Sequence, residues 1–203
     1  MKTKLLLLAL TTIGSGALCA AEAPKVGAPA PAFSLPASNG KTISLGDFRG
    51  KYVVLEWFNP GCPFVQKHYK SDNMQQLQNQ FTGKDVVWLT IDSSAPGKQG
   101  SLTPAEANKQ IAEWKMKSTA LLLDPEGKVG HEYAATNTPH MFVINPEGNL
   151  IYEGAIDSKA STDPADIQGS TNYVKAALEE AMAGKPVANA KTKAYGCSIK
   201  YDH

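Results

Sequence analysis

The chain has 203 residues, 42% of them hydrophobic, and its 20 lysine and arginine residues nearly balance 19 aspartate and glutamate residues. A balanced charge with no basic patch argues against nucleic acids and anionic membranes as partners. The length suits one domain with a sizeable hydrophobic core.

The first residues have the layout of a secretory signal. Lysines at the second and fourth positions precede the apolar run 5–10, and small residues follow up to Ala20 and Ala21. This order predicts a signal peptide over residues 1–20, cleaved after Ala20 or Ala21. The apolar run is too short to span a bilayer, so we expect a periplasmic or secreted protein without a stable membrane anchor.

A lipid-modified Cys19 is the alternative for this segment, but Leu18 stands where a lipoprotein signal needs a small residue. Cleavage of the signal removes two lysines and no acid, which leaves 18 basic and 19 acidic residues. It also leaves two cysteines, Cys62 and Cys197, in a compartment that permits disulfides. Two cysteines can form one bond but not a disulfide scaffold, so the fold must rest on its core.

Apolar runs and periodic stripes predict strands and helices that alternate along the chain. The predicted strands lie near residues 33–35, 42–45, 52–58, 86–91, 120–123, 141–144 and 150–155. Helices are predicted from Cys62 to Phe81 with a break at 70–73, after the Thr103 capping box, and over 174–182. Residues 92–102 and 157–169 are polar, and we expect both to form surface loops.

This order of elements indicates one domain over residues 25–185, followed by a tail over residues 186–203. The tail lacks periodicity but carries Cys197. Strands that alternate with helices, followed by a closing hairpin and a last helix, predict an α/β fold with a central mixed β-sheet sandwiched by helices.

Cys62 stands between the buried run 52–58 and the following helix, with residues 59–61 as the turn. Pro63 takes the first helical position, where a missing N–H costs nothing. The free N–H groups and the positive end of the helix dipole favour thiolate over thiol at this place. Free cysteines are also often small buried hydrophobic residues, but a helix start favours a reactive thiol.

Four segments carry a family resemblance: Val26-Gly-Ala-Pro-Ala-Pro-Ala-Phe33, Leu45-Gly-Asp-Phe-Arg-Gly-Lys51, Trp57-Phe-Asn-Pro-Gly-Cys-Pro-Phe-Val65 and Thr138-Pro-His-Met-Phe-Val-Ile144. With them the chain resembles the redoxin group, the superfamily of alkyl hydroperoxide reductases and thiol-specific antioxidant proteins. It is similar in particular to a secreted subgroup that pairs Gly-Cys-Pro-Phe-Val with a terminal Gly-Cys-Ser-Ile-Lys. The resemblance implies a thioredoxin fold and thiol redox chemistry over about residues 25–185.

The resemblance matches Cys62 to the nucleophilic first cysteine of the thioredoxin Cys-x-x-Cys motif. Val65 stands at the place of the second cysteine, so the local dithiol is absent. We expect Cys197 to resolve Cys62 instead, because a mixed disulfide or sulfenate on Cys62 needs another partner for its release. A permanent structural bond between the two cysteines, or a free Cys197 thiol in a loose tail, stays open.

The resemblance also matches Glu56 to the buried acid that shuttles protons in thioredoxins. Thr138 and Pro139 match the cis-proline turn that packs against the active cysteine, where the backbone of Thr138 pairs with an incoming extended substrate. In an apolar strand the ionised form of Glu56 is costly, which predicts a raised pKa. A purely structural acid, exposed at an edge or satisfied by a lysine, is the alternative.

Two positions depart from classical peroxidases of this group. Those enzymes have Thr or Ser three residues before the reactive cysteine, where this chain has Asn59. They also hold the thiolate with an arginine late in the domain, whereas the single arginine here is Arg49, ahead of the active strand. Without that charge the leaving oxygen of a peroxide loses its main stabiliser.

We therefore expect a secreted thiol–disulfide oxidoreductase that needs no cofactor and meets a disulfide- or peroxide-bearing substrate and a separate reductant. A peroxiredoxin-like peroxide reductase is the first alternative. The second is a non-catalytic metal carrier that uses Cys62 with His140 or His68, since thiolate plus imidazole suits copper. Both histidines are weak candidates, because we expect His68 on a helix flank and His140 as a loop cap.

Overall fold

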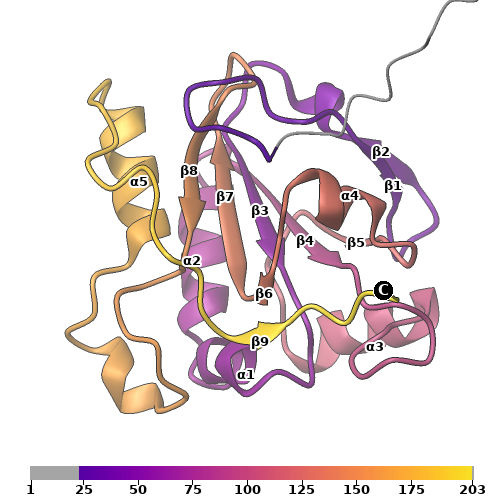
Figure 1. Ribbon diagram of the computed structural model, residues 1–203. Helices are drawn as coiled ribbons and strands as arrows, with labels where there is room; N and C mark the ends of the chain where they lie inside the picture. Colours follow the sequence, from indigo (N-terminus) through magenta and orange to yellow (C-terminus); the bar gives the residue numbers. More distant parts are fainter. Residues whose placement is uncertain (1–22, 203) are drawn as a thin grey trace, which may run out of the picture.

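The computed structural model describes residues 23–202, so the predicted signal peptide lies outside the described residues. Its centre is a five-stranded sheet with the order β5-β4-β3-β7-β8 (Figure 1). The strands are β3 (Val53–Trp57), β4 (Val87–Asp92), β5 (Ala120–Leu123), β7 (His140–Ile144) and β8 (Leu150–Gly154). β3, β4 and β5 are parallel, whereas β7 is antiparallel to both β3 and β8. The predicted central mixed sheet is confirmed.

Helices and a hairpin cover the two faces of this sheet. One face packs against α1 (Pro63–Lys70), α2 (Asn73–Thr82) and α5 (Tyr173–Met182), with α3 (Pro104–Glu113) beside β5. The other face packs against the hairpin β1 (Ser34–Pro36) and β2 (Thr42–Ser44) and against α4 (Lys128–Glu132). Two short 3-10 helices, η1 (Leu45–Phe48) and η2 (Pro164–Ile167), lie in connections. Within residues 23–202, no helix has the length and apolar character that a membrane crossing requires.

The helix predicted after Cys62 is broken where its polar interruption indicated. α1 ends at Lys70, α2 begins at Asn73, and Asp72 between them has a left-handed φ of 59°. α3 begins at the predicted capping box, where the side chains of Thr103 and Glu106 each accept a hydrogen bond from the backbone N–H of the other. Local signals were sufficient for both boundaries.

Five short elements were not predicted: α4, β6 (Asn137–Thr138), β9 (Cys197–Ser198) and the two 3-10 helices η1 and η2. None exceeds five residues, which is too short to show an apolar period. The expected surface loop 92–102 also differs, because it begins buried. Asp92 is 3% exposed, and its carboxylate accepts hydrogen bonds from the N–H groups of Ser94 and Leu102, which closes the loop.

The tail is ordered although it has no periodic pattern. It leaves α5, passes β8, and then runs along β9 beside β6 near the start of α1 (Figure 1). Backbone hydrogen bonds join Thr192 to Glu153 (3.0 Å) and Ile199 to Thr136 (3.1 Å). These contacts hold the segment around Cys197 against the domain without a disulfide.

Candidate active site

The turn before α1 places Cys62 at the end of β3. Cys62 is the N-cap of α1, and its N–H donates to the carbonyl of Asn59 (3.1 Å). The side-chain oxygen of Asn59 accepts from the N–H of Gly61 (2.8 Å), which tightens the turn. The Cys62 side chain is fully buried at the positive end of the helix dipole, a position that favours its thiolate.

Asn59 holds the loop 92–102 over this turn. Its side chain is buried, and Nδ2 donates to the carbonyl of Gln99 (2.9 Å). Gly100 makes the close approach possible, since a Cβ there would lie 2.1 Å from Asn59 Oδ1. Both polar atoms of the Asn59 side chain are therefore engaged by the turn and the loop.

The Thr138–Pro139 peptide bond is cis, the geometry that the resemblance implied. It brings the backbone of Thr138 onto the cysteine, and the Cys62 thiol donates to the Thr138 carbonyl over 3.0 Å. Thr138 is 1% exposed, so this contact is shielded from water.

Cys197 reaches the same point from the tail. β9 pairs antiparallel with β6, with Cys197 opposite Thr138. Cys197 packs against the apolar cluster that contains Cys62, its side chain and backbone lower the pKa of the Cys62 thiol, and both cysteines are free thiols. Cys197 is partly exposed whereas Cys62 is buried. The edge expected to receive an extended substrate is thus taken by the chain's own tail.

The two thiols are shifted in opposite directions. Burial raises the pKa of Cys62, but hydrogen bonds from Thr138, from Cys197 and from the N–H of Val65 outweigh it, and the pKa is lowered. The contact of the Cys62 thiol with the Thr138 carbonyl favours the protonated form, but the several groups that stabilise the ionised sulfur outweigh it. Burial and the neighbouring Cys62 raise the pKa of Cys197 to about 11. Of the two thiols, Cys62 is therefore the one that ionises more readily.

Glu56 is fully buried on β3, on the same face of the sheet as the Cys62 side chain. Its carboxyl accepts hydrogen bonds from Trp88 Nε1 (2.8 Å), Tyr69 Oη (2.9 Å), Gln78 Nε2 (3.2 Å) and Thr90 Oγ1 (3.3 Å). Burial raises its pKa to about 7, and these four donors limit the rise. The raised pKa was predicted, but the satisfying groups are neutral donors rather than a lysine.

A buried polar cluster beside Cys197, the clasp of Lys67, His68, Asp157 and Tyr195, was not predicted from the sequence. Tyr195 Oη donates to the Asp157 carboxylate, and its ring lies against Phe64 with 5.8 Å between centroids. The same carboxylate lies 3.8 Å from Lys67 Nζ and 3.8 Å from His68 Nε2. Lys67, His68 and Asp157 are at most 2% exposed. The clasp is made by the tail, the polar loop after β8 and one face of α1.

The two histidines do not join Cys62 in a metal site. His68, expected on a helix flank, is wholly buried in the clasp, and burial lowers its pKa to about 4. His140 Nδ1 accepts from the N–H of Thr136 (3.3 Å), and its ring lies against Phe142. The described residues contain no group of three or more His, Cys, Asp or Glu side chains that could hold a metal ion. The copper-carrier hypothesis gains no support from this arrangement.

Arg49 lies at the opposite end of β3 from Cys62. It precedes that strand, donates to the carbonyl of Glu147 and packs against Gly148 in the turn between β7 and β8. A strand advances by about 3.3 Å per residue, so the length of β3 separates the guanidinium from the thiol. No arginine therefore stabilises the Cys62 thiolate.

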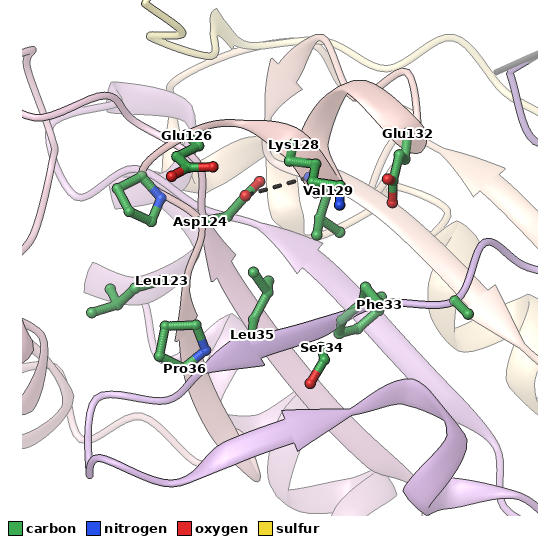
Figure 2. A pocket seen from close by; sticks show the side chains of 12 residues that line it. Phe33, Ser34, Leu35, Pro36, Leu123, Asp124, Glu126, Lys128, Val129 and Glu132 are labelled. Atoms are coloured by element: carbon green, nitrogen blue, oxygen red, sulfur yellow. Dashed lines mark hydrogen bonds between the residues drawn. The ribbon is translucent and has the colours of Figure 1, made fainter. Parts of the chain in front are cut away.

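A cavity of about 560 Å³ lies between β1 and the connection from β5 to α4 (Figure 2). Phe33, Leu35 and Val129 form its apolar wall, and Glu126 and Glu132 stand at its rim. Its lining includes neither cysteine. This cavity belongs to the other face of the sheet and takes no part in the thiol site.

Relatives of known function are thiol redox enzymes. The thiol–disulfide oxidoreductase ResA of Bacillus subtilis is 26% identical over 140 residues, which cover 69% of this chain and 73% of ResA. Peroxiredoxin Bcp of Escherichia coli is 29% identical over 151 residues, covering 60% of this chain and 94% of Bcp. Both names denote oxidoreductases.

Solved structures agree on the fold. An uncharacterized conserved protein from Geobacillus kaustophilus superposes with a TM-score of 0.77 at 24% identity, over 88% of this chain and 93% of that one. A DsbE-type putative thiol:disulfide interchange protein from Chlorobium tepidum superposes with a TM-score of 0.56 at 22% identity, over 77% and 99%. The predicted thioredoxin fold is confirmed.

The model of the AhpC/TSA family matches residues 26–153, a span that contains Glu56, Cys62, Thr138 and Pro139 and ends before the tail. The chain belongs to the AhpC/TSA family.

Proposed function

We propose that this protein is an extracytoplasmic thiol–disulfide oxidoreductase with Cys62 as nucleophile and Cys197 as resolving cysteine. The observation that carries the proposal is that Cys62 contacts Thr138 of β6 while Cys197 of β9 pairs with that same residue, with the pKa of Cys62 lowered and that of Cys197 raised. Thiolates rather than thiols attack disulfides, so the pair has a defined order of reaction.

In the first step, the Cys62 thiolate attacks one sulfur of a substrate disulfide. A bond forms between Cys62 Sγ and that sulfur, the substrate S–S bond breaks, and the other substrate sulfur leaves as a thiolate. The donors that lower the pKa of Cys62 come from Thr138, Cys197 and the first turn of α1. They prepare the nucleophile before the substrate arrives.

In the second step, Cys197 loses its proton and attacks the Cys62 sulfur. The Cys62–Cys197 bond forms, and the second half of the substrate leaves as a thiol. The first half takes up from water the equivalent of the proton that Cys62 released on ionising, so the substrate has gained two electrons and two protons, and a separate dithiol reductant restores the enzyme. We assign Glu56 to proton exchange in this cycle, because a carboxyl with a pKa of about 7 gains and loses a proton near neutral pH.

The organisation of the chain fits this assignment. We propose residues 1–20 as the signal peptide, residues 25–185 as the redoxin domain and residues 186–203 as the tail that supplies Cys197. The basic start, the short apolar run and the small residues near Ala20 support export. Export would place the two cysteines where a disulfide can persist.

Peroxide reduction is the second candidate, supported by the similarity to peroxiredoxin Bcp over 94% of its length. In that reaction Cys62 would become a sulfenic acid, and Cys197 would then displace water and form the same disulfide. Asn59 is engaged by its turn and Arg49 lies at the other end of β3, so neither residue supplies a donor to the leaving oxygen. Loss of such a donor costs about two to three orders of magnitude in rate.

Stopped-flow rate constants of the reduced protein distinguish the two reactions. We expect bis(2-hydroxyethyl) disulfide to react faster with Cys62 than hydrogen peroxide does, by about two orders of magnitude. The signal is the change in tryptophan fluorescence on oxidation, checked by mass spectrometry of quenched samples. A peroxide rate constant well above that of the disulfide would assign the protein to peroxide reduction instead.

A further inference from the structure

The edge of β6 beside cis-Pro139 is where an extended polypeptide disulfide would add as a strand to reach Cys62. In this protein the edge is already paired. Cys197–Ser198 lie antiparallel to Asn137–Thr138, with Cys197 opposite Thr138 and Ser198 opposite Asn137. A polypeptide substrate and the tail therefore compete for one set of backbone groups.

The fit of the tail to this edge is close at Gly196. Its φ is +116°, and a Cβ at this position would lie 2.1 Å from the carbonyl oxygen of Thr138 and 3.5 Å from Phe64 Cβ. The Gly196 carbonyl accepts from Asn137 Nδ2 (2.9 Å). A side chain at this place would push β9 off β6.

Contacts on the N-terminal side of β9 hold the strand in place. Tyr195 donates to the carboxylate of Asp157 and packs against the ring of Phe64. Asp157 is itself fixed in the buried pair with Lys67, whose Nζ also donates to the carbonyl of Lys159 (3.1 Å).

Contacts of the residues that follow β9 also hold this strand in place. The carbonyl of Lys200 accepts from the N–H of Ala95 (2.8 Å), and Tyr201 Oη donates to the carbonyl of Ala135 (2.8 Å). Tyr201 also stacks on His131, with 4.1 Å between ring centroids. The strand is therefore anchored on both sides of Cys197.

We propose that residues 195–199 act as a built-in strand that excludes extended polypeptide disulfides and restricts reduced Cys62 to low-molecular-weight disulfides. This inference rests on the proposed function. A small disulfide needs room for one S–S bond and its two short substituents, and Cys62 can be reached by a brief local opening. A polypeptide must replace the pairing with Thr138 as well, so it must displace the whole anchored strand.

The test uses the full-length mature chain with Cys197→Ser, in which each reaction stops at the Cys62 mixed disulfide. One reagent is bis(2-hydroxyethyl) disulfide. The other is a short extended peptide whose central cysteine carries the same 2-hydroxyethyl disulfide, so the leaving group is matched. Because the peptide must break several strand contacts, we expect its rate constant to be at least about tenfold lower.

Gly196→Ala in the same background should displace β9 from its pairing with β6, because the added Cβ would clash with the carbonyl oxygen of Thr138. We expect the ratio of the peptide rate constant to the small-disulfide rate constant to rise about tenfold, because loss of the Cys197 contacts that lower the pKa of Cys62 affects both reactions alike. Gly184→Ala is the matched control, because Gly184 also has a positive φ (+70°) but a Cβ there meets nothing within 4 Å. Tyr195→Phe keeps the ring and removes only the hydrogen bond to Asp157, so it should change the ratio in the same direction by less.

Circular dichroism melts of each variant establish that the domain is folded. Equal rate constants for the two reagents in Cys197→Ser alone would overturn the proposal that the tail excludes polypeptides. Equal acceleration of both reagents by Gly196→Ala would overturn it as well. An absence of mixed disulfide with either reagent in every variant would overturn the proposed thiol–disulfide exchange itself, and the inference with it.

Discussion

Cys62 and Cys197 meet at one point, but the chain brings them there in different ways. Cys62 follows β3, a strand with all five residues buried, and caps α1 within a large apolar cluster. Cys197 belongs to a two-residue strand in a tail whose described residues, up to 202, form no helix after Met182. The first cysteine is fixed by the core, and the second by a small number of hydrogen bonds and ring contacts.

Local stability follows from this difference. Removing Cys62 from its place requires disruption of the sheet and the first helix, which approaches global unfolding. Releasing Cys197 requires only the loss of its pairing with Thr138 and of the contacts made by Tyr195 and Tyr201. Cys62 is thus held by the core, whereas the position of Cys197 depends on a few contacts of the tail, which suits the proposed roles of nucleophile and resolving cysteine.

The largest effect should come from Cys62→Ser. A hydroxyl at the helix start is not ionised near neutral pH and does not attack disulfides, so exchange with bis(2-hydroxyethyl) disulfide should fall by at least about a thousandfold. The measurement is thiol release under steady turnover with dithiothreitol as reductant. Cys197→Ser is the matched control, because it removes the other sulfur.

Exchange that persists in Cys62→Ser at the parental rate would mean that Cys197 is the attacking thiol. The proposed roles of the two cysteines would then be exchanged, with the cysteine of the tail as nucleophile and the cysteine of the core as its partner.

The next largest effect should come from Cys197→Ser, which separates formation of the mixed disulfide on Cys62 from its release. Cys62 should still form a mixed disulfide in a single turnover, but its release should slow by about two orders of magnitude, because the adjacent resolving thiol is lost. Mass spectrometry of the quenched protein should show one added reagent group in the variant. The parent should show a loss of two hydrogens and a peptide that links Cys62 to Cys197.

Oxidised parent protein that contains only dimers linked between chains would contradict this assignment. It would mean that Cys197 does not resolve Cys62 within one chain.

The Cys62 half of the site could be predicted because its determinants are close together in the sequence. An apolar strand, a Pro-Gly turn and Pro63 in succession place a thiol at a helix start without any long-range information. Glu56 was recognisable as an acid within the same apolar run. Thr138 and Pro139 came from the family resemblance rather than from periodicity.

The Cys197 half could not be predicted in the same way. β6 and β9 are two residues each and pair across 59 positions of sequence, so neither leaves a pattern. The clasp joins Tyr195, Asp157 and Lys67 from three separate segments, and each alone looks like a solvent-exposed polar residue. The one local hint was Gly196 directly before Cys197, a residue type that permits close backbone approach.

The smallest effect concerns Glu56, which is buried in the core on β3, the strand that leads to Cys62. In the unfolded chain its carboxyl titrates near 4.5, whereas burial raises the pKa to about 7 in the folded protein. Between these values the folded state keeps a proton that the unfolded state has lost. The favourable contribution of this group is therefore complete below about pH 4.5 and is lost as the pH rises through 7.

Glu56→Gln keeps the shape of the side chain and cannot ionise. The free energy of unfolding of the variant relative to the parent should rise by on the order of 3 kcal/mol between pH 4.5 and pH 8. Contributions from Asp92 and His68, which also titrate with shifted pKa values, cancel in this difference because both proteins contain them. Urea titrations at four pH values provide the measurement, with the exposed Glu113→Gln as the matched control. A difference independent of pH would mean that the four donors keep Glu56 ionised throughout, and its role in proton exchange would then be untenable.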